Sequence, residues 1–422
     1  MRINYSGAAL ILSIIFSLYS CSVKPDRILT AEPPPQAPLT EAVPELIPEP
    51  EPPPDYLSLI AVGDNLYHDV MVRPTRVKTD DGKEDSVYNF SSNYEPVRAL
   101  VEKADAAFVN QETVFGGRDT GYSGYPLFNT PPEVGEALIG AGFDVVNHAT
   151  NHIMDKGEKG ILFTLDFWDA RPEIICLGIH RSQEARDTRR HIVEKNNIKV
   201  GFLSYTYGTN GIPIPKDKPY LVSLINTEVM EKEIAAIRPL CDFLVVSMHW
   251  GSEYEDEPSR EQERTARFLA EKQVDLIIGH HPHVIQKLAV IPRGDGGSSL
   301  CVYSLGNFIS AQNSFPSRTL LGGMLYLKIK KDKDEIRAEE FGIVPLITHY
   351  EKNYTVMRVY PLYDYTEELA ERHGIKNKYK DMELNAFKEQ AVKALGDKLL
   401  DHDPFNAPSP LNASSVMIRK VF

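Results

Sequence analysis

Three of the chain's 12 histidines stand within four residues, as His280, His281 and His283. The largely apolar run Asp275–Ile278 before them has the composition of a buried strand, and Gly279 ends it. A loop at the carboxyl end of a strand points its side chains into a crevice, and imidazole is the commonest metal ligand in proteins. The alternative is a surface loop that is rich in histidine by coincidence. Because the cluster directly follows a buried strand, we expect it to bind a metal ion.

Polar side chains also follow four other runs that have the character of buried strands. These side chains are Asp64, Glu112, the pair Asn151 and His152, and His249. Together with the histidine loop, they predict a set of ligands that strand ends deliver to one edge of a sheet. Carboxylates, an amide oxygen and imidazoles suit Mn²⁺, Fe or Zn²⁺, and two such ions ~3.5–4 Å apart form a hydrolytic centre. Taken singly, each residue has a structural alternative: Asp64 could cap a turn, Glu112 could pair with a lysine, and Asn151 could satisfy backbone groups.

The elements that must position these residues alternate along the chain. Strand-like and helical patterns alternate over residues 57–310, which predicts an α/β core in one domain. The expected strands are 57–62, 106–110, 143–147, 174–177, 191–194, 199–205, 243–247, 275–278, 284–291 and 300–305, and the expected helices are 95–103, 131–140, 157–169, 227–237 and 260–272. Residues 311–422 show strands at 324–330, 336–344 and 355–360, then helices at 365–373 and 382–400, and we expect them to complete the core or pack on it. The residues from Pro404 onward are expected to be loose.

The N-terminus has the features of a targeting segment. Arg2 precedes the apolar stretch Ala8–Leu18, which is too short to span a bilayer. The stretch ends in LYSC, which resembles a bacterial lipobox, so residues 1–20 are expected to be a lipoprotein signal peptide and Cys21 the lipid-bearing first residue. The alternative is an ordinary signal peptide with an incidental cysteine.

Prolines and glutamates in residues 21–56 disfavour a packed core and predict a tether. We therefore expect a protein of the cell envelope, anchored on the outer face of the cytoplasmic membrane or on the outer membrane.

The composition narrows the range of partners. A net charge of −13 argues against nucleic acid as the main partner. An anionic substrate stays compatible with this charge, because bound cations would reverse the local field. Cys176, Cys241 and Cys301 lie in or beside apolar runs and are expected to be buried thiols without disulfides.

Six strings of the chain carry a family resemblance: GDNLYHD, VNQETVF, NHATNHIMDKG, HWGSEY, GHHPHVIQ and SLGNFI. They resemble the poly-gamma-glutamate capsule biosynthesis (CapA-type) family, which is related to the calcineurin-like metallophosphoesterases. The resemblance implies a four-layer αββα sandwich of two sheets flanked by helices. It implies a metal site made of Asp64, Glu112, Asn151, His249, His281 and His283. It implies that His152 protonates the leaving group and that Asp155 orients it. His280, His68 and Asn307 are additional candidates.

The chain departs from the superfamily pattern at the first metal site. The superfamily carries an Asp-x-His motif there, whereas Leu66 stands two residues after Asp64, and His68 is out of register. Thr150 and Gln111 also replace the Asn and Leu that are usual in the family. The missing histidine leaves open whether the site holds one metal ion or two. Within the histidine loop, the second and third histidines are favoured as ligands over the first.

Three functions are compatible with these residues. The leading hypothesis is a lipid-anchored, metal-dependent hydrolase that attacks a phosphoryl centre, or else an acyl centre, while His152 protonates the leaving group. The second is a non-catalytic component of capsule or exopolymer assembly and export that uses the metal pocket to hold an anionic polymer. The third is a structural lipoprotein with an inactive site.

Overall fold

The structure is a computed structural model that describes residues 54–77, 87–312, 314–333, 335–376, 378–379, 382–406 and 415–420. The expected signal peptide, the lipid-bearing Cys21 and most of the expected tether lie outside the described residues. Within the described ranges, none of the helices combines the length and the apolar character that a membrane span requires.

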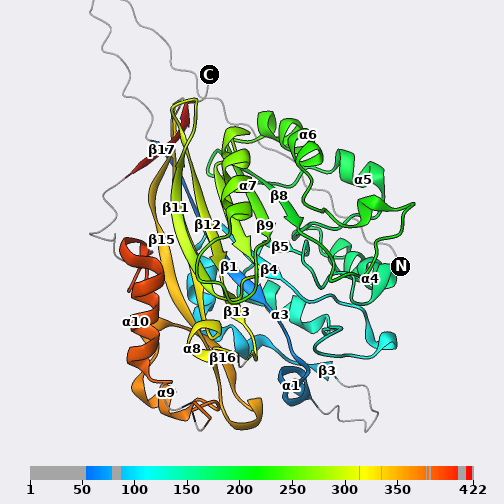
Figure 1. The fold of residues 1–422 in the computed structure, drawn as a ribbon, viewed down its shortest axis with the longest axis vertical. Helices are drawn as coiled ribbons and strands as arrows, with labels where there is room; N and C mark the ends of the chain where they lie inside the picture. The colour runs from blue at the N-terminus through cyan, green and yellow to red at the C-terminus, as the bar shows by residue number, and fades with distance from the viewer. Residues whose placement is uncertain are drawn as a thin grey trace, which may run out of the picture. The chain divides into compact units, whose positions relative to one another are not determined.

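The larger of two main sheets has nine strands and is built around β1 (Figure 1). Its order is β16-β15-β14-β1-β4-β5-β6, with β13 also paired to β1 and β17 to β15. The bounds are β1 Asp55–Asn65, β4 Ala106–Gln111, β5 Val145–Asn147, β6 Ile175–Leu177, β13 Asn307–Ile309, β14 Leu321–Asp332, β15 Glu335–Tyr350, β16 Met357–Pro361 and β17 Val416–Lys420. Strands β1, β4, β5 and β6 are parallel, while β14 to β17 pair antiparallel. The strands after Ser310 thus extend the sheet that β1 begins.

The second sheet has six strands in the order β11-β12-β10-β9-β8-β7. The bounds are β7 Ile192–Lys195, β8 Ile198–Thr206, β9 Phe243–His249, β10 Leu276–His280, β11 Ile285–Pro292 and β12 Ser298–Leu305. Its four inner strands are parallel and both edge strands are antiparallel. The expected hairpin is confirmed: Asn196 and Asn197 turn between β7 and β8 with φ of 50° and 59°, as a two-residue primed turn requires.

Helices flank the two sheets (Figure 1). Their bounds are α1 Asp69–Val72, α2 Glu95–Lys103, α3 Glu133–Ala141, α4 Gly157–Asp169, α5 Gln183–Thr188, α6 Thr227–Ile237, α7 Arg260–Glu271, α8 Pro316–Thr319, α9 Glu367–Arg372 and α10 Leu384–Leu395. Ile234 of α6 and Leu269 of α7 pack in one apolar cluster with strands of the six-stranded sheet. Val101 of α2 and Leu138 of α3 belong to a larger core that both sheets share. The expected α/β class is therefore confirmed.

Local sequence explains how α7 leads the chain into β10. Ser259 accepts a hydrogen bond from the backbone of Gln262 at 3.2 Å, and the Gln262 side chain accepts one from the Ser259 backbone at 2.8 Å. This reciprocal capping satisfies two of the free N–H groups at the helix start. The apolar face of the helix, which includes Ala266 and Leu269, packs into the buried apolar cluster of the six-stranded sheet.

The expectation for the C-terminus is wrong in part. Val416–Lys420 forms β17 and pairs with the first half of β15. Ile418 is fully buried in this strand, with 0% of its surface exposed. A segment this short gains its strand conformation from the edge of β15, a partner that lies far away in sequence, so its own residues carry little signal.

Candidate metal centre

Both sheets contribute to the predicted site. From the nine-stranded sheet come Asp64 in β1, Glu112 just after β4 and Asn151 in the turn after β5, and from the six-stranded sheet come His249 at the end of β9 and His281 and His283 after β10. All six side chains are buried. The expectation that one edge of one sheet would supply them is wrong, because the carboxyl ends of the parallel strands of the two sheets meet.

Two glycines bring the strand ends together. A Cβ on Gly63 would lie 1.9 Å from the carbonyl oxygen of Gly306, and this close approach allows the Asp64 N–H to donate to that oxygen at 2.9 Å. A Cβ on Gly279 would lie 1.8 Å from the carbonyl oxygen of Tyr303. Larger residues at these two positions would push the strands that carry Asp64 and the histidine loop away from the end of β12 and from Gly306, which follows it.

Asp64 is held by several donors. Asn110 donates from Nδ2 to Asp64 Oδ1 at 2.8 Å, and the backbone N–H of His281 donates to Oδ2 at 3.3 Å. His283 Nδ1 lies 3.0 Å from Asp64 Oδ2 and 3.0 Å from Asn307 Oδ1. Asp64 and Asn307 therefore fix the ring of His283, and the candidate Asn307 acts here as a partner of a predicted ligand.

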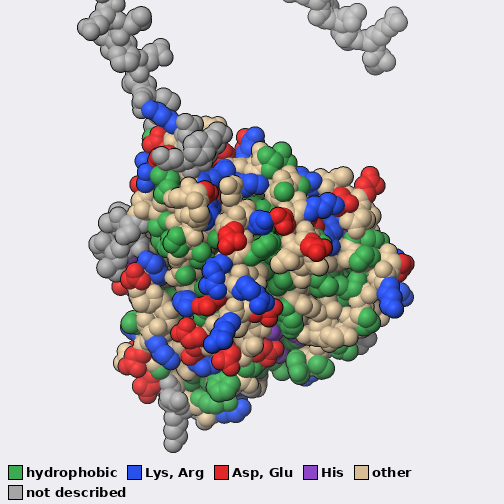
Figure 2. Space-filling model, turned by 45° about the horizontal axis from the view of Figure 1, so that its top comes forward, with side chains coloured by type: hydrophobic (Ala, Val, Ile, Leu, Met, Phe, Trp, Pro, Cys, Tyr) green, Lys and Arg blue, Asp and Glu red, His purple; other side chains and the backbone are tan. Residues whose placement is uncertain are grey.

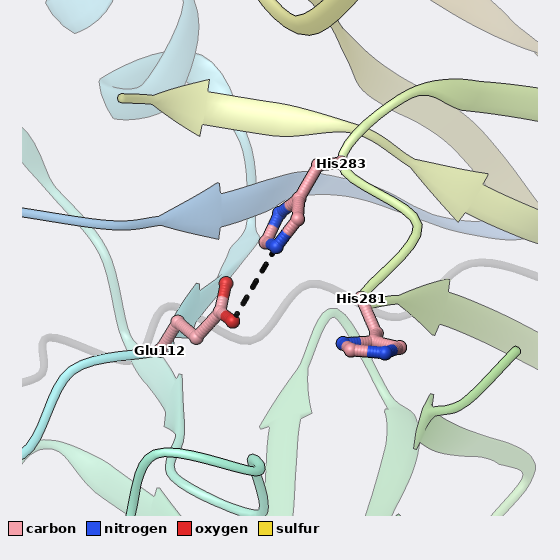
Figure 3. Close-up of side chains that lie close together, drawn as sticks. All are labelled: Glu112, His281 and His283. Carbon is pink, nitrogen blue, oxygen red and sulfur yellow. Dashed lines mark ion pairs between the residues drawn. The ribbon is translucent and has the colours of Figure 1, made fainter. Parts of the chain in front are cut away.

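Glu112 has no such donors. Neither of its carboxylate oxygens has a hydrogen-bond partner among the described residues. The nearest imidazole nitrogens are Nε2 of His249 at 3.8 Å and Nε2 of His283 at 3.9 Å from Oε1. In Figure 3, Glu112 and His283 point toward each other, and His281 lies beside them. Ligand atoms of Glu112, His281 and His283 all lie within 4.8 Å of one another.

This donor set fits a metal ion. Buried polar atoms are almost always hydrogen-bonded, yet within the described chain Nδ1 of His249 and Nδ1 of His281 are also without a partner, like the oxygens of Glu112. A carboxylate and imidazoles are the ligands that Zn²⁺ and related ions take from proteins. The side chains that converge here thus present unsatisfied acceptor atoms of the right chemistry.

Backbone strain marks the same loop. His281 has φ of 96° and His283 has φ of 59°, a region that residues with side chains rarely adopt. Such conformations cost about 1–3 kcal/mol each and are found where function requires them. In this loop they place both imidazoles on the Glu112 side of the strand end.

The charges in the site perturb one another. Burial alone would raise the pKa of Asp64, but its contacts with His280 and His283 hold that pKa well below the usual range. Burial raises the pKa of Glu112 well above its usual value. Burial lowers the pKa of His283, but the negative charges of Glu112 and Asp64 outweigh it and raise the pKa to about 9. The two carboxylates therefore favour a positive charge on His283.

The expected proton donor lies in its own small network. His152 Nδ1 is 2.8 Å from Asp155 Oδ2, as the resemblance implies. Asp155 Oδ2 also accepts from the backbone N–H of Phe128 at 2.8 Å, and the Phe128 ring meets the His152 ring edge to face with 4.7 Å between centroids. These contacts fix the ring through Nδ1 and leave Nε2 as the nitrogen available for chemistry.

His152 and His283 both line a cavity of about 450 Å³. We call it the reaction cavity; it is lined by Leu66, His68, Asp69, Val70, Tyr125, Phe128, His152, Glu253, Tyr254, His283, Ala311, Gln312, Ser314 and Tyr354. On the face shown in Figure 2, histidine is visible as a small area near the lower edge, beside hydrophobic and acidic side chains. The predicted donor and a predicted ligand thus share one solvent-accessible space.

The remaining candidates have separate positions. Asn151 Oδ1 lies 2.8 Å from His249 Nε2, so these two predicted ligands bond to each other. His280 is fully buried, its Nδ1 lies 3.6 Å from Asp64 Oδ1, and its ring stacks on Phe108 with 5.7 Å between centroids. His280 therefore lies between Asp64 and the aromatic core residue Phe108 as a neighbour of both.

Two residues that follow Asp64 closely in sequence lie beside the site. His68 lines the reaction cavity, where its Nδ1 accepts a weak hydrogen bond from the Ala311 backbone at 3.4 Å. Burial lowers the pKa of His68 to about 4, so the ring is neutral at pH 7. Leu66, 2% exposed, adds an apolar wall nearby.

Sequence reasoning missed several residues that shape the site. Asn110 and Asn147 form a chain of side-chain bonds behind Asp64, with 2.7 Å from Asn147 Nδ2 to Asn110 Oδ1. Asn210 accepts from Asn151 Nδ2 at 3.2 Å. The two strand-end asparagines could have been found, because each is a polar residue at the end of an apolar run. Asn210 and Phe128 lie in loops whose composition carries no such signal.

Comparison with solved structures finds distant likenesses. A 5'-nucleotidase precursor from Thermus thermophilus is 13% identical with a TM-score of 0.40, covering 80% of this chain and 59% of that one. The NAD nucleotidase of Haemophilus influenzae is 12% identical with a TM-score of 0.40, covering 83% and 65%. Similarity at this level carries no inference about activity.

Comparison with known sequences is more informative. Capsule biosynthesis protein CapA of Bacillus anthracis is 33% identical over 187 residues, a match that spans 43% of each chain. PGA biosynthesis protein CapA of Bacillus subtilis (strain 168) is 27% identical over 297 residues, or 70% of this chain and 72% of that one. The family described as bacterial capsule synthesis protein PGA_cap matches residues 58–312, and these residues include every predicted metal ligand. The expected resemblance is confirmed, and the chain belongs to the bacterial capsule synthesis protein family PGA_cap.

Proposed function

We propose that this protein is a metal-dependent hydrolase of the cell envelope that acts on a phosphoester or on a capsule polymer. The observation that carries the proposal is the buried group of Glu112, His281 and His283, whose ligand atoms converge beside the cavity that His152 lines. Within the described residues, both carboxylate oxygens of Glu112 and Nδ1 of His281 have no hydrogen-bond partner. A bound Mn, Fe or Zn ion would supply an activated water and would stabilise the negative charge of the transition state.

The residues of the chain have distinct parts in this proposal. Glu112, His281 and His283 would hold the ion, and Asp64 would either join them or orient His283 through Nδ1. In the reaction, a water oxygen bonds to the phosphorus or carbonyl carbon, the bond to the leaving oxygen breaks, and that oxygen takes a proton. His152 would donate this proton from Nε2, because Asp155 occupies Nδ1.

The test is metal analysis together with turnover of bis(p-nitrophenyl) phosphate by the purified full-length protein. We expect bound or acquirable Mn, Fe or Zn, and we expect Asp64→Ala and His283→Ala to lose both metal and activity. His402→Ala, which changes a partly exposed histidine bonded to Asp401, is the control. Absence of metal, together with unchanged turnover in the two site variants, would overturn the proposal.

A second function has its own support. The two relatives are described as biosynthesis proteins, and the apolar Leu66 replaces a histidine at the first site. In this alternative the protein is a non-catalytic part of exopolymer assembly or export, and the pocket holds an anionic polymer. Polymer binding that survives His152→Ala, with no hydrolysis by the wild type, would favour it.

We also propose the cellular position. The LYSC string that ends the apolar N-terminal stretch supports lipidation at Cys21, and the Pro- and Glu-rich residues 21–56 support a spacer between the lipid and the folded part. The anchor would hold the site at a membrane surface where a capsule polymer is made.

A further inference from the structure

A second, larger cavity adjoins the reaction cavity. It has a volume of about 800 Å³ and shares Asp69 and Tyr125 with the reaction cavity. We call it the outer cavity; it is lined by Asp69, Val72, Arg73, Arg76, Tyr88, Tyr122, Ser123, Gly124, Tyr125, Pro126, Leu127 and Lys156. Helix α1 and the two-stranded ribbon of β2 (Arg76–Val77) and β3 (Val87–Tyr88) lie near each other at the bottom of Figure 1.

The outer cavity carries positive charge that the described residues do not fully neutralise. Of its three cations, Arg73 pairs with Asp69. Lys156 donates to a neutral acceptor, the Leu127 carbonyl oxygen, at 3.1 Å, and Arg76 has no acidic partner within the described ranges. In a chain of net charge −13, two cations that line one cavity and have no acidic partner among the described residues indicate an anionic ligand.

The reaction cavity has the opposite character. Its lining, within the described chain, contains no lysine or arginine, and Glu253 lies exposed on it. A substrate that carries a second negative charge is therefore repelled from the Glu253 wall and attracted toward Lys156 and Arg76.

The loop that carries the proton donor also reaches the outer cavity. Lys156 follows Asp155 directly, and Asp155 holds His152 at 2.8 Å. Phe128 lines the reaction cavity and its neighbour Leu127 lines the outer one. The outer cavity therefore lies on the side of His152, the side from which the leaving group departs.

Aromatic surface accompanies the positive charge. Tyr125 is 77% exposed and Leu127 is 48% exposed, and the Tyr122 and Tyr88 rings meet edge to face with 5.4 Å between centroids. Exposed and half-buried rings beside cations suit a ligand that combines an apolar or planar part with a charged group.

We propose that the outer cavity is a leaving-group subsite, which binds a carboxylate or phosphate on the part of the substrate that is released. This rests on the proposed hydrolase function. Arg76 and Lys156 bind the distant anion, Tyr122 and Tyr125 contact the linking part, and the metal ligands hold the ester that reacts. The substrate is thus an ester with anionic groups on both sides of the bond that breaks.

The test compares two fluorogenic esters that differ by one distant charge. They are 4-methylumbelliferyl phosphate and the phosphate of 7-hydroxycoumarin-4-acetic acid, whose leaving group has the same ring and an added carboxylate. We expect the metal-loaded full-length protein to favour the carboxylated ester in kcat/KM, and Arg76→Gln or Lys156→Gln to reduce this preference about tenfold, chiefly through KM. Lys159→Gln, an exposed lysine of α4 outside the cavity, should retain it. Equal losses for both esters, or no loss, would overturn the subsite.

Binding separates this proposal from the hydrolase proposal. The two coumarin leaving groups alone, without phosphate, are titrated into the full-length protein and followed by their fluorescence. Tighter binding of the carboxylated coumarin, weakened by Lys156→Gln but not by Lys159→Gln, supports the subsite even if neither ester is hydrolysed. A lack of preference between the two coumarins refutes the subsite, whatever the turnover.

Discussion

Replacing Glu112 with glutamine should have opposite effects on stability with and without metal. The side chain is fully buried, and its carboxylate oxygens have no donor among the described residues. Glutamine keeps the size of the side chain and removes its charge. If the Glu112 carboxylate is a metal ligand, its buried charge destabilises the metal-free protein. The same charge stabilises the metal-bound protein, because it then contacts a cation.

The distances give the size of the effect without metal. Glu112 Oε1 lies 3.9 Å from Nε2 of His283, and at an effective dielectric constant of ~20 such a pair of opposite charges attracts by about 4 kcal/mol. Burial of a carboxylate costs several kcal/mol, and Asp64 adds repulsion. Because the pKa of Glu112 is raised well above its usual value, the unfavourable effects exceed the attraction. Glu112→Gln should therefore stabilise the metal-free protein by about 1–3 kcal/mol at pH 7, because each pH unit between 4.5 and the folded pKa contributes about 1.4 kcal/mol.

The pH dependence follows from the same shift. A carboxyl whose pKa is higher in the folded chain than its unfolded value of 4.5 penalises folding above that value. The penalty grows as the pH rises from 4.5 toward the folded pKa, and it is absent at lower pH, where the group is protonated in both states. The advantage of Glu112→Gln should thus be present at pH 7 and disappear below about pH 4.

Bound metal should make the wild type more stable than Glu112→Gln, which is the reverse of their order without metal. Loss of a charged ligand should weaken metal affinity at least ~100-fold, or about 2.7 kcal/mol, so metal that saturates the wild type should stabilise the variant much less. The assay is urea unfolding in EDTA and in excess Mn²⁺ or Zn²⁺. Glu253→Gln, an exposed carboxylate on the reaction cavity, is the control and should show no reversal. A variant that is less stable in EDTA and binds metal normally would show that Glu112 is a structural residue.

Two further predictions concern the proton donor and the anchor. Asp155→Asn should lower kcat about 10–100-fold while metal content stays at the wild-type level. The variant still has an oxygen that accepts from the Phe128 N–H, but it has no charge to orient His152. Unchanged kcat measured with bis(p-nitrophenyl) phosphate would refute the role of Asp155. Cys21→Ser should abolish labelling by radioactive palmitate and release the protein from membranes on fractionation, and persistent labelling would contradict the lipobox interpretation.

Local patterns accounted for much of the secondary structure. The helices 95–103, 157–169 and 227–237 have the bounds that their apolar periodicity predicts. The hairpin at Asn196 and Asn197 was foreseen because asparagine adopts positive φ more readily than most residues. Such elements depend on neighbours a few residues away, and their signals are therefore present in the sequence.

The arrangement of the strands depends on distant partners and was foreseen less well. β14 is the neighbour of β1 in the sheet although their residues are far apart in sequence. Likewise, the division of the ligands between two sheets depends on how the sheets face each other. Strand ends could be recognised from apolar runs that stop at polar residues, but the sheet to which each strand belongs could not. The ligand candidates were thus found, and the way the fold assembles them was not.

The hydrogen bonds of the two carboxylates bear on how many ions the site holds. Asp64 already accepts bonds from Asn110 and the His281 backbone and lies 3.0 Å from His283 Nδ1. Glu112 has no such partners within the described residues. A cation at Glu112 satisfies atoms that no other described residue satisfies, whereas one at Asp64 must displace existing bonds. We infer that the position beside Glu112 binds first and more tightly, so that a second ion, if bound, is held with lower affinity.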